Sequence, residues 1–266
     1  MRIDITIPTK WNQLTPFQLK LIGRLLYSKT EFEKKFFRQL LVTVIFIPKV
    51  KFIHFWKFFL ILREVGFDGI LHYADFIFDE ADCLTKFPEF YKVGKTKLFG
   101  PGERLQNITI NELSYADAFY FNWIHKSDEK DLQRLVACLY RPADKQPKET
   151  DIRKPFDKLL LPKNAELTDR IALSDMYIIA LAYQGSRETF KKRYPYVFPK
   201  PAKSEEEQPE PTIKKPLKYT PFSKLVASMA MDEVQIFGTI SETENANAMQ
   251  FLEMYNETLL RESKRR

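Results

Sequence analysis

The amino-acid sequence predicts a mainly α protein, a multi-helix bundle with a short N-terminal strand and a small β-hairpin. Apolar side chains recur three and four residues apart in most segments, which is the spacing of one helix face. The 266 residues include only 8 glycines, too few for a many-turned β-sandwich. Hydrophobic residues make up 44% and charged residues 29%, a globular mixture that excludes an intrinsically disordered chain.

The first elements follow from local spacing. Residues 2–7 place isoleucine at every second position, which predicts a short strand. Thr15 and Pro16 are the residue types preferred at the N-cap and the first position of a helix, and that helix is predicted to end near Tyr27. Residues 28–47 carry the next helical pattern, with acidic residues near its start.

Residues 40–62 form a long apolar band that Pro48 and three lysines interrupt. A lysine at the middle of a bilayer costs roughly 2.5–3.5 kcal/mol on the insertion scale, so no membrane span is predicted. We interpret the band as two buried helices joined at the proline. The alternative is an exposed interfacial or partner-binding face, in which Phe52, Phe55 and Trp56 would contact the partner.

The strongest helical signal lies in residues 107–142, where two helices are joined by a short loop. Thr109 or Asn111 would cap the first helix, and Ser127 or Asp128 the second. The apolar faces consist of Leu113, Ala116, Tyr120, Trp123 and Ile124 in the first helix and Leu132, Leu135, Val136 and Leu139 in the second. An αα-hairpin of this kind packs its two faces on each other and serves as a scaffold.

The segments around this hairpin are less regular. Turn residues are frequent before it, which predicts short helices and a small β-hairpin across residues 91–105. Residues 141–155 are polar and punctuated by proline, so a loop is predicted there. Residues 167–183 predict a helix that is apolar on most sides and therefore central, with Gly185 as its C-cap and Ser186 starting another short helix.

A stretch rich in proline and charge divides the chain. Residues 199–221 are predicted to be an extended linker between a helical main domain, residues 1–198, and a C-terminal helical segment, residues 222–266. The last helix of this segment carries an apolar stripe that is either core or a second partner-binding face. The linker favours a mobile segment that can bind a partner. Its candidate contact residues are Phe251, Met254, Tyr255 and Leu259.

The overall charge permits an anionic partner without requiring one. There are 42 basic against 35 acidic side chains, a formal net charge of +7, and both signs are interspersed along most of the chain. Cys83 and Cys138 lie far apart without a metal-binding or redox spacing, which predicts reduced, buried thiols. No basic and apolar leader opens the chain, so a cytoplasmic location is expected.

Two sequence fragments resemble nucleotide-binding motifs but lack the required arrangement. Residues 79–82 spell DEAD, and residues 94–96 spell the end of a P-loop. The phosphate loop should precede the acidic motif, and Glu89 stands where its first glycine belongs. An ATPase is therefore not predicted.

Catalytic and metal-binding patterns are also weak. Four side chains recur at helical spacing and mix imidazole with carboxylate, a possible metal face that we interpret as a solvated acidic surface: His72, Asp75, Asp79 and Asp82. No Ser/His/Asp or Cys/His spacing suggests a nucleophile. The sequence predicts no catalytic residue, no cofactor and no metal.

Two clusters interleave basic and aromatic residues, as single-stranded nucleic-acid sites do. The first combines Lys49, Lys51 and Lys57 with Phe52, Phe55 and Trp56, and the second combines Lys191, Lys192 and Arg193 with Tyr194 and Tyr196. No nucleic-acid-binding signature accompanies them. Core aromatics beside lysines that extend to the surface are the favoured interpretation.

Three segments resemble proteins of bacteriophage and prophage tail modules. They are residues 7–15, the block from residue 108 through the LVACLYRP run that ends at Pro142, and the final helices over residues 227–262. The last of these is similar to the end of phage tail-assembly chaperones.

The resemblance implies a helical, non-enzymatic protein in the host cytoplasm. Its partners would be phage tail proteins, because such chaperones shield the hydrophobic tape-measure protein while tail-tube subunits polymerise around it. The alternative function is that of a basic nucleic-acid-binding or virion structural protein.

Overall fold

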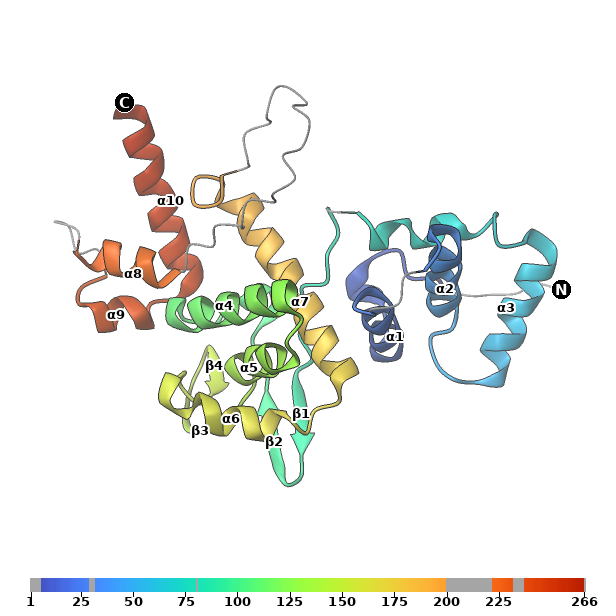
Figure 1. Ribbon diagram of the computed structural model, residues 1–266, viewed down its shortest axis with the longest axis horizontal. Coiled ribbons are helices and arrows are strands. Elements are labelled where there is room, and N and C mark those ends of the chain that lie inside the picture. The colour runs from blue at the N-terminus through green and yellow to red at the C-terminus, as the bar shows by residue number, and fades with distance from the viewer. Residues whose placement is uncertain (1–5, 29–31, 80, 200–221, 232–236, 266) are drawn as a thin grey trace.

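The computed structural model describes residues 6–28, 32–79, 81–199, 222–231 and 237–265. The molecule is elongated, with an N-terminal lobe at one end and a larger main body at the other (Figure 1). The lobe contains α1 (Pro16–Leu26), α2 (Lys34–Phe46), α3 (Phe52–Val65) and the 3-10 helix η2 (Leu71–Ile77). Helix α3 and the C-terminal helix α10 (Ala248–Arg265) lie at opposite ends (Figure 1).

Helix α1 starts where the sequence predicts. The Thr15 side chain accepts a hydrogen bond from the Gln18 backbone, and the Gln18 side chain accepts one from the Thr15 backbone, which makes a capping box. Gln18 Nε2 also donates to the carbonyl of Ile45 at 2.6 Å and so ties α1 to the end of α2. The start of α2 is later than predicted, and residues 29–31 and most of the predicted strand lie outside the described residues.

The apolar band separates into one buried and one exposed helix. Leu41, Val42, Ile45 and Phe46 of α2 are buried, whereas Phe58 is the buried side chain of α3. The interpretation as two buried helices is therefore right for α2 and wrong for α3. The physical reason is that α2 lies against both α1 and η2, while α3, within the described part of the chain, packs mainly against α2.

The main body is built on the predicted αα-hairpin. Helix α4 (Ile110–Lys126) has Thr109 as its N-cap, and α5 (Glu129–Leu139) has Asp128. Ser127 between them adopts a left-handed conformation with φ of 54°. Of the predicted apolar faces only Ile124 is exposed, so the two helices pack on each other as expected.

A four-stranded antiparallel sheet lies beside this hairpin in the described part of the chain. Strands β1 (Phe90–Val93) and β2 (Thr96–Phe99) form the predicted β-hairpin. Strands β3 (Arg141–Lys148) and β4 (Asp151–Arg153) occupy the stretch predicted to be a loop, which corrects that prediction. The β3 strand has prolines and no apolar alternation; it forms because Leu98 and Phe99 of the distant hairpin pair with its first two residues.

Helix α7 (Leu173–Arg193) runs between the lobe and the main body (Figure 1). The central helix is confirmed, but it continues past Gly185, which is neither a C-cap nor followed by a new helix start. A Cβ atom at Gly185 would lie 2.1 Å from the carbonyl oxygen of Leu84. The lack of a side chain at Gly185 therefore lets α7 lie close to the backbone at Leu84, in the segment that links the lobe to the main body.

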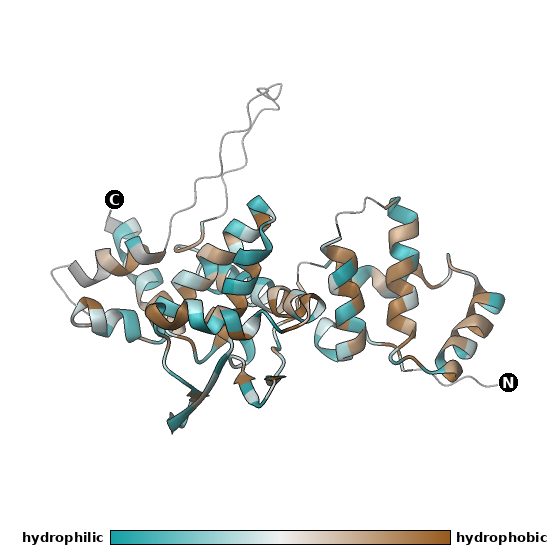
Figure 2. Ribbon diagram, turned by 60° about the horizontal axis from the view of Figure 1, so that its bottom comes forward, coloured by the Kyte–Doolittle hydropathy of each residue, from teal (hydrophilic) through white to brown (hydrophobic). Residues whose placement is uncertain are grey.

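Two hydrophobic cores share α7. Ile178, Leu181 and Ala182 belong to the core of the lobe, whereas Ile179 and Tyr183 belong to that of the main body. Figure 2 shows brown, apolar stretches along the helices of both parts. One helix buried on opposite sides explains why its sequence is apolar nearly all round.

The C-terminal helices pack on α4. They are α8 (Phe222–Met231), α9 (Ile240–Asn245) and α10, and residues 200–221 of the predicted linker lie outside the described residues. Phe251 and Leu252 are fully buried in the core of the main body. Helix α9 was not predicted, although Thr239 and Glu242 form a capping box that the sequence contains.

A buried network of side-chain ion pairs holds α4, α5 and the sheet together. Glu112 Oε1 lies 2.9 Å from Arg141 Nη1 and 2.8 Å from Arg153 Nη1, and Arg153 also pairs with Asp151. Both arginines donate further hydrogen bonds to backbone carbonyls, including that of Leu139. Glu112 has the capping-box spacing from Thr109, yet its carboxylate binds the arginines instead.

We predict that Glu112→Gln lowers the free energy of unfolding by about 3–5 kcal/mol, because it leaves two buried guanidinium groups without their shared carboxylate. Glu129→Gln, at an exposed position in the first turn of α5, is the control. Denaturant unfolding followed by circular dichroism measures both. Equal stability of the two variants would contradict a structural role for the network.

We also predict that Gly185→Ala destabilises the protein by more than about 2 kcal/mol, although alanine usually favours a helix. The cause is the contact between the new methyl group and the Leu84 carbonyl. Gly102→Ala is the matched control, since its Cβ would lie 3.4 Å from Asn107 Oδ1, an ordinary contact. Thermal melting distinguishes them, and an unchanged melting temperature in Gly185→Ala would refute the close approach.

Candidate functional site

An exposed aromatic face on α3 is the most distinctive surface feature of the described chain. Phe52, Phe55, Trp56 and Phe59 are 81%, 46%, 47% and 56% exposed. Their spacing of i, i+3, i+4 and i+7 places them on one side of the helix. Neighbouring rings are stacked, with centroids 6.3 Å apart for Phe52 and Trp56 and 6.1 Å apart for Trp56 and Phe59. We call these four residues the aromatic face.

The opposite side of α3 anchors it to the lobe. Phe58 packs against Phe46 of α2 and Phe67, with ring centroids 5.6 Å and 6.2 Å away. Gly66 ends the helix with φ of 71°, a conformation that favours glycine. The aromatic face is therefore held outward by a packed helix and not by a loose loop.

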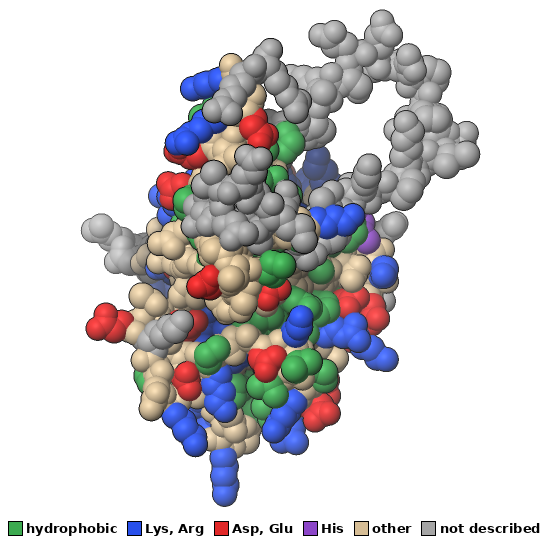
Figure 3. All heavy atoms as spheres, turned by 90° about the vertical axis from the view of Figure 1, so that its left-hand side faces the viewer, with side chains coloured by type: hydrophobic (Ala, Val, Ile, Leu, Met, Phe, Trp, Pro, Cys, Tyr) green, Lys and Arg blue, Asp and Glu red, His purple; other side chains and the backbone are tan. Residues whose placement is uncertain are grey.

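Positive charge is concentrated on the same part of the lobe. Residues 34–63 contain seven basic and no acidic side chains, which equals the formal excess of the whole chain. Two of them are neutralised from outside the segment, Lys35 by Asp68 and Arg38 by Asp75. At the other end of the molecule basic and acidic side chains are interspersed (Figure 3).

The start of α3 adds to this positive potential. Lys51 occupies the N-cap position without a side-chain cap, and the first turn has no acidic residue. The backbone N–H groups at a helix start carry partial positive charge. Among the described residues, Lys49, Lys51 and Arg63 form no close ion pair, and Glu64 is the acidic neighbour of Arg63 in the last turn of α3.

The predicted stripe on α10 is only partly a surface. Phe251 is fully buried, so it is not available to a partner. Met254 is exposed, and Tyr255 and Leu259 are half-buried. The C-terminal stripe thus divides into an inner part that anchors the helix and an outer part that water reaches.

The two basic and aromatic clusters differ in how exposed their aromatic side chains are. Phe52, Phe55 and Trp56 are exposed, so the interpretation of the first cluster as core aromatics is wrong; α3 packs through Phe58 instead. In the second cluster Tyr194 is buried and donates a hydrogen bond to the Met249 carbonyl. The first cluster has the open geometry of a binding surface, and the second is largely structural.

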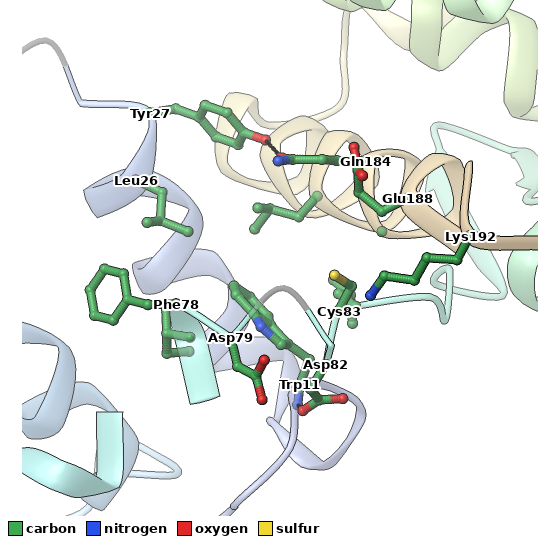
Figure 4. A pocket seen from close by; sticks show the side chains of 14 residues that line it. Trp11, Leu26, Tyr27, Phe78, Asp79, Asp82, Cys83, Gln184, Glu188 and Lys192 are labelled. Carbon is green, nitrogen blue, oxygen red and sulfur yellow. Dashed lines mark hydrogen bonds between the residues drawn. The ribbon is translucent and has the colours of Figure 1, made fainter. Parts of the chain in front are cut away.

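A cavity of about 540 Å³ lies where the lobe meets α7 (Figure 4). Trp11, Asp82 and Cys83 line one side, and Gln184 and Lys192 of α7 line the other. Tyr27 donates a hydrogen bond to Gln184 Oε1 across the cavity at 3.2 Å. The cavity is thus bounded by contacts that join the two parts of the molecule.

The thiols have an environment that disfavours nucleophilic chemistry. Burial raises the pKa of the Cys83 thiol, with the nearby Lys192 opposing that shift, and raises the pKa of the fully buried Cys138 thiol still further. Neither cysteine forms a disulfide with a described residue. Cys138 is buried, as the sequence predicts, whereas Cys83 is only half-buried, which corrects the prediction for that thiol. A raised thiol pKa keeps the less reactive protonated form at neutral pH.

The acidic residues considered as a metal face have other partners. Asp75 pairs with Arg38, and Asp82 Oδ2 accepts a hydrogen bond from the Trp11 backbone at 3.0 Å. Within the described ranges no group of three or more His, Cys, Asp and Glu side chains has an arrangement that fits a metal ion.

Comparison with known proteins identifies no relative of this chain. No protein-family model, curated protein sequence or solved structure matches the chain. Among the described helices, none combines the length and the apolar character needed to cross a bilayer.

Sequence reasoning identified three of the four aromatic-face residues and missed Phe59. It also missed the segregation of charge, because the whole-chain balance looks interspersed. Both signals are present in the sequence: Phe59 continues the i, i+3, i+4 spacing, and residues 34–63 lack any Asp or Glu. Only the structure shows which side of α3 is open.

We predict that iodoacetamide alkylates Cys83 more slowly than free cysteine at pH 8.5, because the raised thiol pKa lowers the thiolate fraction. Cys138 should stay unmodified until the protein unfolds, since it is fully buried. Mass spectrometry of timed samples gives both rates, and guanidinium-unfolded protein is the control. Faster modification of native Cys83 than of free cysteine would indicate an activated thiol.

Proposed function

We propose that this protein is a non-enzymatic binding protein that holds an apolar segment of a partner polypeptide on the aromatic face of α3. The single observation behind the proposal is the exposure of Phe52, Phe55, Trp56 and Phe59 on one side of a packed helix. Large exposed apolar patches mark interaction sites in soluble proteins. Aromatic residues are also enriched among the residues that dominate binding energy.

The face exposes enough apolar area to contribute to binding a partner. Aromatic side chains offer roughly 150–250 Å² each, so at these exposed fractions the four leave roughly 350–600 Å² in water. At about 25 cal/mol per Å², covering that area gains on the order of 10 kcal/mol before the cost of association. Val50 and Ile53, also exposed, widen the apolar surface.

The resemblance to phage tail-assembly chaperones suggests the particular partner. Such a partner is a tape-measure protein, whose long apolar helices need shielding until the tail tube forms around them. The aromatic face supplies a surface suited to that task, and the host cytoplasm is the compartment where it would act. The protein would then release its partner as the other tail proteins assemble.

Nucleic-acid binding is the second candidate, and one specific observation favours it. The first basic and aromatic cluster is exposed, with Lys49 and Lys51 adjoining the ring stack of Phe52 and Trp56. Phosphate contact by lysine and base stacking on aromatic rings are the usual means of binding single strands. Such binding would weaken steeply as salt rises.

The proposal is tested with Phe55→Ala/Trp56→Ala/Phe59→Ala. Co-expression with a tape-measure-like protein should raise the soluble yield of that protein with the wild-type chain, and the triple variant should lose most of the gain. Because the three side chains are exposed, the free energy of unfolding should change by less than about 1 kcal/mol per substitution. Thermal melting checks that the variant remains folded.

Leu159→Ala/Leu160→Ala provides the matched control, because it removes exposed apolar side chains from the main body. This control should keep the wild-type effect on partner solubility. Loss of activity in both variants, or in neither, would contradict a role for α3. Salt-sensitive retention of the wild-type chain on single-stranded DNA, lost in the triple variant, would favour the second candidate.

A further inference from the structure

We infer that the segment held by α3 is an amphipathic helix whose apolar stripe is flanked by Asp and Glu side chains. The inference rests on the proposed function and adds the chemistry of the partner. Its basis is the juxtaposition of the aromatic face with a segment, residues 34–63, that contains basic side chains and no acidic one.

The shape of α3 determines the kind of partner segment. A helix satisfies its own backbone hydrogen bonds, so α3 offers no open strand edge, and recognition must occur through side chains. Its 14 residues span about 21 Å, at about 1.5 Å per residue. A second helix of three to four turns matches that length. Its apolar residues, spaced i, i+3, i+4 and i+7, would lie along the stack of Phe52, Trp56 and Phe59.

The charges around the face determine what flanks that stripe. Lys49 and Lys51 lie at the start of α3, and the helix dipole places further positive potential there. Arg63 lies in the last turn, where Glu64 follows it, so the excess of positive charge is greatest at the start of the helix. Acidic side chains on the partner helix would approach these groups as the apolar surfaces close, while basic ones would be repelled.

The repulsion among the basic side chains near α3 also favours a partner with acidic flanks. Lys51 at the uncapped N-cap position, with Lys49 just before it, is repelled by the positive end of the helix dipole and so destabilises α3. Residues 34–63 therefore retain a repulsive charge pattern that a partner with acidic flanks would relieve. A neutral apolar partner would bury the aromatic face and leave that repulsion unchanged.

The test uses the full chain and three synthetic helical peptides of about 18 residues, a length that spans α3. The peptides share one leucine stripe and differ only in their flanking residues, which are Glu, Gln or Lys. Fluorescence anisotropy measures each affinity. The Glu peptide should bind at least roughly tenfold more tightly than the Gln peptide, and the Lys peptide most weakly.

Charge-reversal variants show where the preference comes from. Lys49→Glu/Lys51→Glu should abolish the preference for the Glu peptide, and about 0.5 M salt should reduce it in the wild-type chain. Lys92→Glu/Lys95→Glu makes the same change of net charge at exposed positions of the β1–β2 hairpin and should keep the preference. Loss of preference in both variants would indicate a non-specific effect of net charge and overturn the inference.

The remaining outcomes distinguish a failure of this inference from a failure of the proposed function. Equal affinity for the Glu and Gln peptides, lost in Phe55→Ala/Trp56→Ala/Phe59→Ala, would overturn the acidic partner and leave the proposed function standing. Binding of no peptide would overturn both. Binding only to vesicles of anionic phosphatidylglycerol, through the aromatic face, would also overturn both and make α3 a membrane-surface helix.

Discussion

The burial of α7 between two hydrophobic cores is the constraint on which the rest of the structure depends. Ile178 and Leu181 complete the core of the N-terminal lobe, while Ile179 and Tyr183 complete that of the main body. Contacts of α1 with the same helix, including the 2.9 Å ion pair of Lys20 and Asp175, fix the lobe to it. Helix α3 lies at the end of the lobe away from α7 (Figure 1), and within the described residues it packs through Phe58 and leaves its aromatic side exposed.

The two ends of the molecule differ in how charge and apolar surface are distributed. In the main body, charge is either paired in the interior, as in the Glu112, Arg141 and Arg153 network, or mixed with opposite charge at the surface. On the lobe, residues 34–63 combine exposed aromatic rings with unbalanced positive charge. Neither feature stabilises the folded chain, and under the proposed function each would increase the affinity for a partner that covers apolar surface and carries acidic groups.

The apolar stripe of the C-terminal helix α10 is buried at its start and exposed further along. Phe251 and Leu252 are buried against the main body, whereas Met254, one turn further on, is exposed. The backbone of Ile110 donates to the Ala246 carbonyl and that of Ala248 to the Ile108 carbonyl, so the start of α10 is joined directly to the start of α4. The described part of the C-terminal segment thus completes the core of the main body as well as offering a surface.

The sequence by itself determined the helical class, the αα-hairpin, the β1–β2 hairpin, the N-cap of α1 at Thr15 and the central burial of α7, because each depends on residue types a few positions apart. Only the tertiary structure decided the β3 and β4 strands, the continuation of α7 through Gly185 and the exposure of α3. The first two depend on contacts between distant segments, Leu98 with Pro142 and Gly185 with Leu84. The third arises because no neighbour among the described residues buries Phe52, Phe55, Trp56 and Phe59. Spacing identifies the apolar face of a helix, but the placement of neighbouring elements determines whether that face is buried.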